Sequence, residues 1–138
     1  MATSPAEALR QVPLFADLSD EDLGRLARQM KERRFKEGAE VTTEGAGGAG
    51  FFVIVEGNAN VSVGGEQRAT LGPGDYFGEI ALIDEGARTA TVTADTELRC
   101  YGMTSWEFRP LVEMDARIAW KLLQAMAKRL RTAQQQPA

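Results

Sequence analysis

The sequence predicts one mainly β domain with helices before and after the strands. Three observations support this fold class: short runs in which apolar residues recur at every second position, glycine-rich turns between those runs, and helical apolar spacing near both ends of the chain. Short strands separated by such turns are typical of a barrel or jelly roll. The 138 residues suit a single domain with its own core. We expect a helical segment at 1–34, strands at 35–103 and helices at 104–133.

The N-terminal segment contains a clear helix start. Ser19 precedes an acidic turn and can cap the helix, and Asp22 stands at the reciprocal position of a capping box. Apolar residues then recur at helical spacing from Leu23 onward. A shorter helical turn is expected near 6–11, because Pro13 cannot continue it.

The central segment reads as strands joined by tight turns. Residues 51–55 form a continuous apolar run, whereas 59–63 and 90–94 alternate apolar and small polar side chains. Residues 98–103 are a further candidate strand. The pair of glycines at 64–65 marks a turn.

Two helices are predicted after the strands. Thr104 and Glu107 form a capping box, and Pro110 is expected to end or kink the first helix. The second helix, over 115–133, is apolar around roughly 220° of its circumference, far wider than the ~100° stripe that packing on one core needs. Either the extra face meets a second chain or a ligand, or the helix wraps deeper into its own domain. Its basic residues are interpreted as a solvated face that suits the helix dipole: Lys121, Lys128, Arg129 and Arg131.

The composition excludes several classes of protein. The net charge of −4 argues against direct binding to nucleic acid, which requires lysine and arginine to neutralise phosphates. The chain has no histidine, so it lacks the commonest general base and metal ligand, and we expect neither catalysis nor a bound metal. One cysteine, Cys100, allows no disulfide within the chain and fits a reducing compartment. No apolar run approaches the ~20 residues that cross a membrane, and a cytoplasmic location is expected.

The segment 77–92 carries the most chemical information. Gly78 leaves room for a ligand to reach the backbone, and a helical turn at 78–83 would offer free N–H groups to an anion. Arg88 supplies a planar fork for phosphate oxygens, and Glu79 can accept a hydrogen bond from a sugar hydroxyl. From residue types alone, a Glu–Arg salt bridge or two separate surface charges remain simpler explanations than a ligand site.

The order and spacing of this segment resemble those of a known family. The run Phe77-Gly78-Glu79-Ile80-Ala81-Leu82, followed by Arg88-Thr89-Ala90-Thr91-Val92, is similar to the phosphate-binding cassette of the cyclic nucleotide-binding domain family. This family includes catabolite activator proteins, regulatory subunits of cyclic-nucleotide-dependent kinases and cyclic-nucleotide-gated channels. The resemblance extends to Pro13-Leu14-Phe15, to Gly72-Pro73-Gly74-Asp75 and to the final helix around Met126-Ala127-Lys128-Arg129-Leu130, and so covers nearly the whole chain.

The resemblance implies an antiparallel β-roll, a jelly roll of the double-stranded β-helix type, with N-terminal helices and a long C-terminal helix. The cassette would occupy 74–92, with Arg88 on the cyclic phosphate and Glu79 on the ribose 2′-hydroxyl. Backbone groups and one hydroxyl would complete the phosphate cradle, from Gly78, Ile80, Ala81, Thr89 and Ala90. The final helix would cover the base.

The implied function is a non-catalytic sensor of cyclic AMP, in which the ligand favours a closed position of the final helix. The threonine beside the arginine, Thr89, makes a preference for cyclic GMP an alternative. The expected partner is a second copy joined through the C-terminal helix or an unidentified effector protein. No helix-turn-helix follows that helix in the sequence, so DNA binding is not expected. The rival hypotheses are a module that keeps the fold without using a ligand, and a metal-dependent enzyme of the cupin type.

Overall fold

The structure, a computed structural model, describes residues 3–45 and 50–134. Its strands are β1 (Lys31–Phe35), β2 (Glu40–Thr42), β3 (Phe51–Glu56), β4 (Ala59–Val63), β5 (Glu66–Leu71), β6 (Tyr76–Phe77), β7 (Thr91–Ala94) and β8 (Leu98–Met103). Its helices are α1 (Pro5–Arg10), the 3-10 turn η1 (Pro13–Phe15), α2 (Asp20–Ala27), α3 (Ala81–Asp84), α4 (Ser105–Met114) and α5 (Ala116–Gln134).

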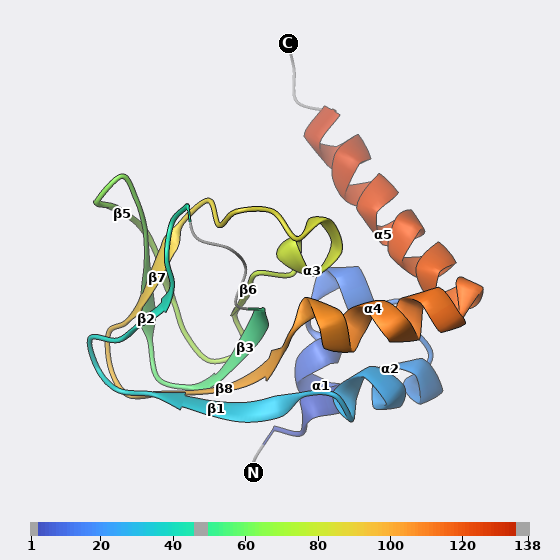
Figure 1. Cartoon of the computed structure of the whole chain (residues 1–138), viewed down its shortest axis with the longest axis horizontal. Helices are drawn as coiled ribbons and strands as arrows, with labels where there is room; N and C mark the ends of the chain where they lie inside the picture. The colour runs from blue at the N-terminus through green and yellow to red at the C-terminus, as the bar shows by residue number, and fades with distance from the viewer. Residues whose placement is uncertain (1–2, 46–49, 135–138) are drawn as a thin grey trace.

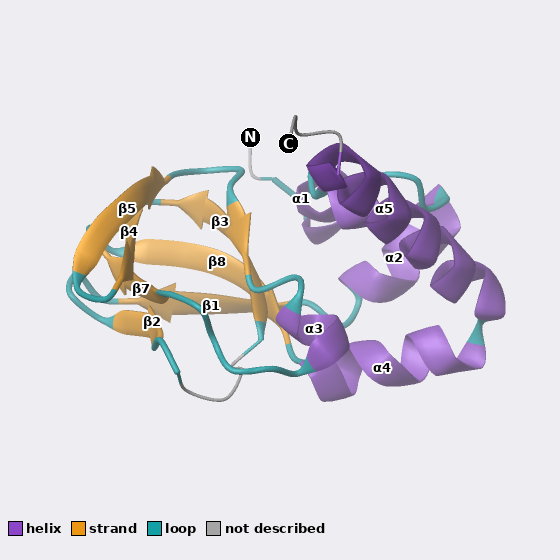
Figure 2. Cartoon of the chain, turned by 90° about the horizontal axis from the view of Figure 1, so that it is seen from above, coloured by secondary structure: helices purple, strands orange, loops and turns teal. Residues whose placement is uncertain are grey.

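Within the described residues, the strands form two four-stranded antiparallel sheets, ordered β1-β8-β3-β6 and β2-β7-β4-β5. The sheets face each other as a roll, and the helices gather at one end of it (Figures 1 and 2). This antiparallel β-roll, with N-terminal helices and a long C-terminal helix, confirms the predicted fold class.

Strand β3 joins the two hydrophobic cores of the molecule. Phe51 and Val53 point to the core formed with the helices, whereas Phe52 and Ile54 point into the roll. Successive side chains of a strand face opposite sides, so a strand buried on both faces needs an apolar residue at every position. The continuous apolar run at 51–55 is therefore a direct sign of this central place.

The strand region begins at Lys31, a correction to the predicted start at residue 35. The side chains of Lys31, Glu32, Arg33 and Arg34 are exposed, because β1 is an edge strand held by backbone pairing with β8. Charged side chains on an edge strand hinder pairing with other chains, and they also hide the strand from a search for apolar alternation. Strand β5 is also exposed along most of its length, and it was not predicted because its side chains show no apolar alternation.

The predicted caps are present at both helical ends of the domain. The Ser19 hydroxyl accepts a hydrogen bond from the backbone N–H of Asp22 at 3.1 Å, and Thr104 and Glu107 form the capping box that starts α4. Helix α4 continues past Pro110 to Met114, so of the two predicted effects, an end or a kink, the end is wrong and the kink stays a prediction. The capping box and the buried Phe108 hold the first turns in place despite the hydrogen bond that proline cannot donate.

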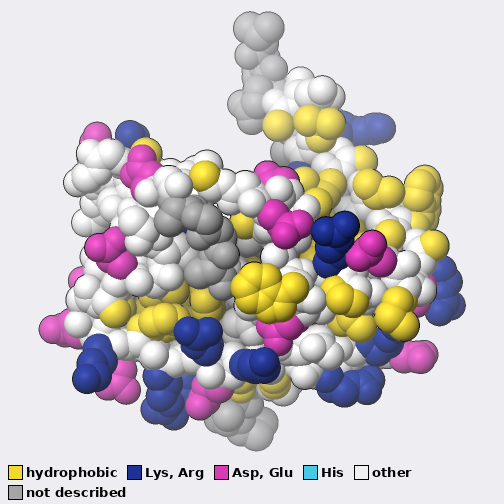
Figure 3. All heavy atoms as spheres, in the orientation of Figure 1, with side chains coloured by type: hydrophobic (Ala, Val, Ile, Leu, Met, Phe, Trp, Pro, Cys, Tyr) yellow, Lys and Arg dark blue, Asp and Glu magenta, His cyan; other side chains and the backbone are white. Residues whose placement is uncertain are grey.

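Helix α5 is anchored along one narrow stripe near its N-terminal half. Only Ile118, Leu122 and Ala125 are buried among its described residues. Exposed large apolar side chains lie around the rest of the helix, at Trp120, Leu123 and Leu130. The interpretation that α5 wraps deeper into its own domain is therefore wrong. Figures 1 and 3 show α5 rising away from the roll, with hydrophobic side chains gathered over α4 and α5. Across the described residues, no helix combines the length and apolar character needed to cross a membrane.

The cap at Ser19 gives a first prediction, about stability. Ser19→Ala leaves the Asp22 N–H without its side-chain acceptor, and we expect the free energy of unfolding to fall by about 1 kcal/mol in urea titration. Ser62→Ala is the control, because the Ser62 side chain makes no hydrogen bond within the described residues and lies on β4. Equal losses in the two variants would contradict a capping role.

Candidate functional site

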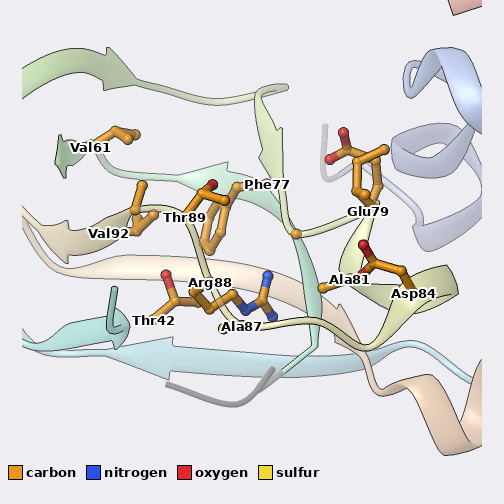
Figure 4. A pocket seen from close by; sticks show the side chains of 13 residues that line it. Thr42, Val61, Phe77, Glu79, Ala81, Asp84, Ala87, Arg88, Thr89 and Val92 are labelled. Carbon is orange, nitrogen blue, oxygen red and sulfur yellow. The ribbon is translucent and has the colours of Figure 1, made fainter. Parts of the chain in front are cut away.

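A cavity of about 430 Å³ lies between the roll and α3, a volume within the ~300–1,000 Å³ range of small-molecule sites. The predicted site residues all line it: Gly78, Glu79, Ile80, Ala81, Arg88, Thr89 and Ala90. Further lining residues were not singled out as ligand contacts from the sequence: Thr42, Val61, Phe77, Asp84, Ala87 and Val92. Figure 4 shows the Arg88 side chain in the middle of this group, with Glu79 toward the helical end.

The Arg88 side chain is the central feature of the cavity. It is 8% exposed, and its Nη2 donates a hydrogen bond to the carbonyl oxygen of Gly50. Its Nε is buried and has no hydrogen-bond partner within the described part of the chain. Burial lowers the pKa of Arg88, and the nearby Glu79 carboxylate opposes this effect. A buried cation with a free donor is costly unless an acceptor meets it, so this geometry suits an anionic ligand.

Gly78 makes room for that arginine. Its φ of 88° lies in the left-handed region that other residues rarely adopt. A Cβ at this position would lie 2.5 Å from the Gly50 carbonyl oxygen and closer still to Arg88 Nη1. A side chain cannot be added here without displacing the guanidinium.

Glu79 is also buried, at 8% exposure, and its partner comes from the far end of the chain. Its Oε1 accepts a hydrogen bond from Arg129 Nη1 of α5 at 3.2 Å. Burial, and next the charge of Glu79, raises the pKa of the neighbouring Tyr76. The two simpler explanations for Glu79 and Arg88 are both wrong, because each residue is buried and Glu79 pairs with α5 instead of Arg88.

The contact between Arg129 and Glu79 was not predicted from the sequence. The neighbouring Lys128 also makes a tertiary ion pair, with Asp17 at 3.0 Å. Both side chains are exposed, as the interpretation of a solvated face predicts, and each also makes an ion pair with a distant segment that was not predicted. A lone sequence gives no sign of which carboxylate a helical arginine will reach.

The short helix of the cassette begins later than expected. Helix α3 spans Ala81–Asp84 in place of the predicted turn at 78–83, and its C-cap residue, Glu85, has a φ of 54°. The Glu85 carboxylate accepts a hydrogen bond from the Ser105 hydroxyl at 3.4 Å and lies 3.8 Å from Arg109. The cassette is thus tied to the start of α4.

The donors and acceptors of the cavity fit a ligand that carries both an anion and a hydroxyl. Arg88 has an unpaired donor in its buried Nε, and Oε2 of Glu79 accepts no hydrogen bond within the described residues. In those same residues, no group of three or more potential ligands could hold a metal ion.

Comparison with known proteins gives a consistent result. The family model described as "Cyclic nucleotide-binding domain" matches residues 32–115. The cAMP-dependent protein kinase regulatory subunit of Yarrowia lipolytica is 41% identical over 93 residues, which is 66% of this chain and 25% of that protein. The CRP-like cAMP-activated global transcriptional regulator of Mycobacterium tuberculosis is 30% identical over 130 residues, which is 91% of this chain and 58% of that protein.

A solved structure extends this similarity to nearly the whole chain. The N-terminal domain of a transcriptional regulator from Streptomyces coelicolor A3(2) superposes with a TM-score of 0.86 at 32% sequence identity, covering 95% of this chain and 97% of that one. The chain spans a quarter of the length of the kinase subunit and little more than half of the M. tuberculosis regulator.

The close approach at Gly78 gives a second prediction. Gly78→Ala places a methyl group against Arg88 in an unfavourable backbone conformation, and we expect a loss of about 1–3 kcal/mol in the free energy of unfolding. Gly24→Ala in α2 is the matched control, since nothing lies within 4 Å of the place that a Cβ would take there. Chemical denaturation measures both. An unchanged stability of the Gly78 variant would show that the tight packing around Arg88 is misassigned.

Proposed function

The chain belongs to the cyclic nucleotide-binding domain family, and we propose that it is a non-catalytic sensor that binds cyclic AMP in the cavity between the roll and α3. One observation carries this proposal: a buried guanidinium with an unpaired donor stands in the same cavity as a buried carboxylate. The first suits a cyclic phosphate and the second a ribose hydroxyl, so together they match a nucleotide that carries both groups on one ring.

The remaining contacts come from the cassette backbone. Arg88 binds the phosphate and Glu79 accepts a hydrogen bond from the ribose 2′-hydroxyl. The backbone of Gly78, Ile80 and Ala81, with Thr89 and Ala90, completes the phosphate cradle; all of them line the cavity. Cyclic AMP is favoured because the kinase subunit is named for dependence on it and the M. tuberculosis regulator for activation by it. The Thr89 hydroxyl supports cyclic GMP as the second candidate.

Movement of α5 is the proposed output. Arg129 occupies one oxygen of Glu79, so the ribose hydroxyl takes the other, and the ligand and the helix share one carboxylate. An apolar groove of about 530 Å³ lies among α3, α4 and α5, lined by residues that include Leu82, Val112 and Leu123. A ligand that binds more tightly to one position of α5 shifts the population toward that position.

The exposed apolar residues of α5 support a protein partner for this output. Trp120, Leu123 and Leu130 are each at least 60% exposed, and large apolar residues exposed together mark interaction surfaces. A second copy of the chain or an effector protein would cover this face. The same observation favours the second candidate function, an interaction module that keeps the fold without a ligand.

Ligand binding is tested by titration calorimetry with cyclic AMP and cyclic GMP. We expect Arg88→Leu to weaken binding by about tenfold to a hundredfold, the range for one charge-assisted hydrogen bond, and Glu79→Ala to weaken it as well. Arg68→Leu is the control, because Arg68 is exposed on β5, away from the cavity. Affinities equal to that of the unchanged protein in both site variants would reject these roles, and binding of neither nucleotide would favour the interaction module.

Movement of α5 is tested by spin-label distances. Burial raises the pKa of the Cys100 thiol to about 12, so labels attach selectively at Gln67→Cys and Arg131→Cys, both exposed positions. We expect cyclic AMP to change the distance between these labels, and Arg129→Gln to reduce the change.

The control for this prediction lies on the same helix. Lys121→Gln removes the same charge from α5, but Lys121 makes no ion pair within the described residues. A distance that stays constant while calorimetry records binding would refute the coupling and leave the binding site intact.

A further inference from the structure

The described residues contain few buried polar side chains, and those that are buried share one cavity. Thr42, Glu79 and Arg88 are the buried polar or charged residues of this part of the chain, each exposed by 8% or less, and each of them lines the cavity. Burying a polar group is unfavourable unless it finds a hydrogen-bond partner. Glu79 and Arg88 have protein partners and proposed ligand contacts, which leaves Thr42 to be explained.

Thr42 lies at the end of the cavity remote from Glu79. It is opposite Val92 of β7, which in turn is opposite Val61 of β4, so the three residues are neighbours across one sheet. Figure 4 shows these three side chains at one end and Glu79 and Asp84 at the other, with the Arg88 side chain between them. Thr42 is 5% exposed and lines the cavity. Its hydroxyl makes no hydrogen bond within the part of the chain that the structure describes, and its oxygen is not fully buried, so it faces the cavity.

We infer that Thr42 hydrogen-bonds the polar edge of the purine base, the edge that carries N7 and the 6-substituent. This rests on the proposed function, since Arg88 and Glu79 must first hold the phosphate and the ribose. The base is then the part of the ligand left for the end that Thr42 shares with Val61 and Val92 (Figure 4), which departs from the expectation that the final helix covers the base. The valines suit the apolar face of a purine, and the lone hydroxyl there can donate or accept one hydrogen bond.

This placement also limits what Thr42 can discriminate. A hydroxyl can donate to the 6-oxo group of guanine or accept from the 6-amino group of adenine, and either ring has N7 as an acceptor. Thr42 therefore selects for a purine with a polar edge, and leaves the choice between adenine and guanine to other residues.

The experiment is calorimetric titration of Thr42→Val with three ligands: cyclic AMP, its purine riboside analogue without the 6-amino group, and its 7-deaza analogue. Valine keeps the branched shape that suits a strand. We expect cyclic AMP to bind about threefold to tenfold more weakly to the variant, the range for one neutral hydrogen bond. The loss should shrink to less than about twofold for at least one analogue, the one that lacks the bonded group.

Two controls separate base recognition from structure. Thr93→Val makes the same substitution at the position of β7 next to Val92, outside the cavity lining, and should bind all three ligands as the unchanged protein does. Thermal unfolding of ligand-free Thr42→Val should show no loss of stability, because the hydroxyl has no described partner to lose.

The possible outcomes are distinct. An equal loss for all three ligands would place Thr42 on the sugar or phosphate and overturn the inference, as would no loss for any of them. If the unchanged protein binds no cyclic nucleotide at all, the proposed function itself is overturned. A loss confined to ligands that retain one polar group of the purine edge supports the assignment and identifies that group.

Discussion

The burial of the Arg88 guanidinium is the constraint on which the rest of the site depends. Moving a charge out of water costs several kcal/mol even after local relaxation, and the described surroundings only partly compensate. The carbonyl of Gly50 accepts one hydrogen bond, Glu79 contributes a favourable field, and Gly78 provides the space by having no side chain. The Nε donor has no partner among the described residues, so part of the desolvation free energy stays uncompensated. An anion bound in the cavity would therefore also stabilise the fold.

The fold places this cavity where the β-roll meets the helices (Figure 2). Strand β3 ties the roll to the helical core through side chains on both of its faces, so that part of the molecule resists deformation. Helix α3 belongs to the cassette and is joined to α4 through Glu85. The outer half of α5 has no buried residue beyond Ala125 among those described, and ion pairs hold it through Lys128 and Arg129. Both basic side chains are more than two-fifths exposed, so these ion pairs contribute little to stability and that half of α5 is weakly held.

Local physics made much of the fold predictable. The strands at 59–63 and 98–103, the Ser19 cap and the capping box all follow from patterns within a few residues, and the structure confirms them. The cassette was predictable from its resemblance to a known family, because its cavity-lining residues lie together at 77–92, whereas Thr42 and Val61 line the cavity from distant strands. Strand β1 was not, since its stability comes from backbone pairing with β8, which leaves no trace in its charged side chains.

The contacts missed at the site share one physical cause, which is that they join segments far apart in the chain. Arg129 of α5 hydrogen-bonds Glu79, and the spacing of residues along a helix does not indicate which distant side chain an arginine will contact. Thr42 stands beside another threonine, so residue type could not decide which hydroxyl faces inward; the pairing of β2 with β7 decides it.

The weak seating of the outer half of α5 has a consequence for any assembly that contains this domain. Coupling free energy between two binding events is reciprocal. If nucleotide and α5 share the carboxylate of Glu79, whatever protein grips α5 shifts the nucleotide concentration at which the cavity half-fills. The nucleotide concentration at half-saturation would then be a property of the complex and not of the chain alone. The same chain could respond to different nucleotide concentrations when bound to different partner proteins.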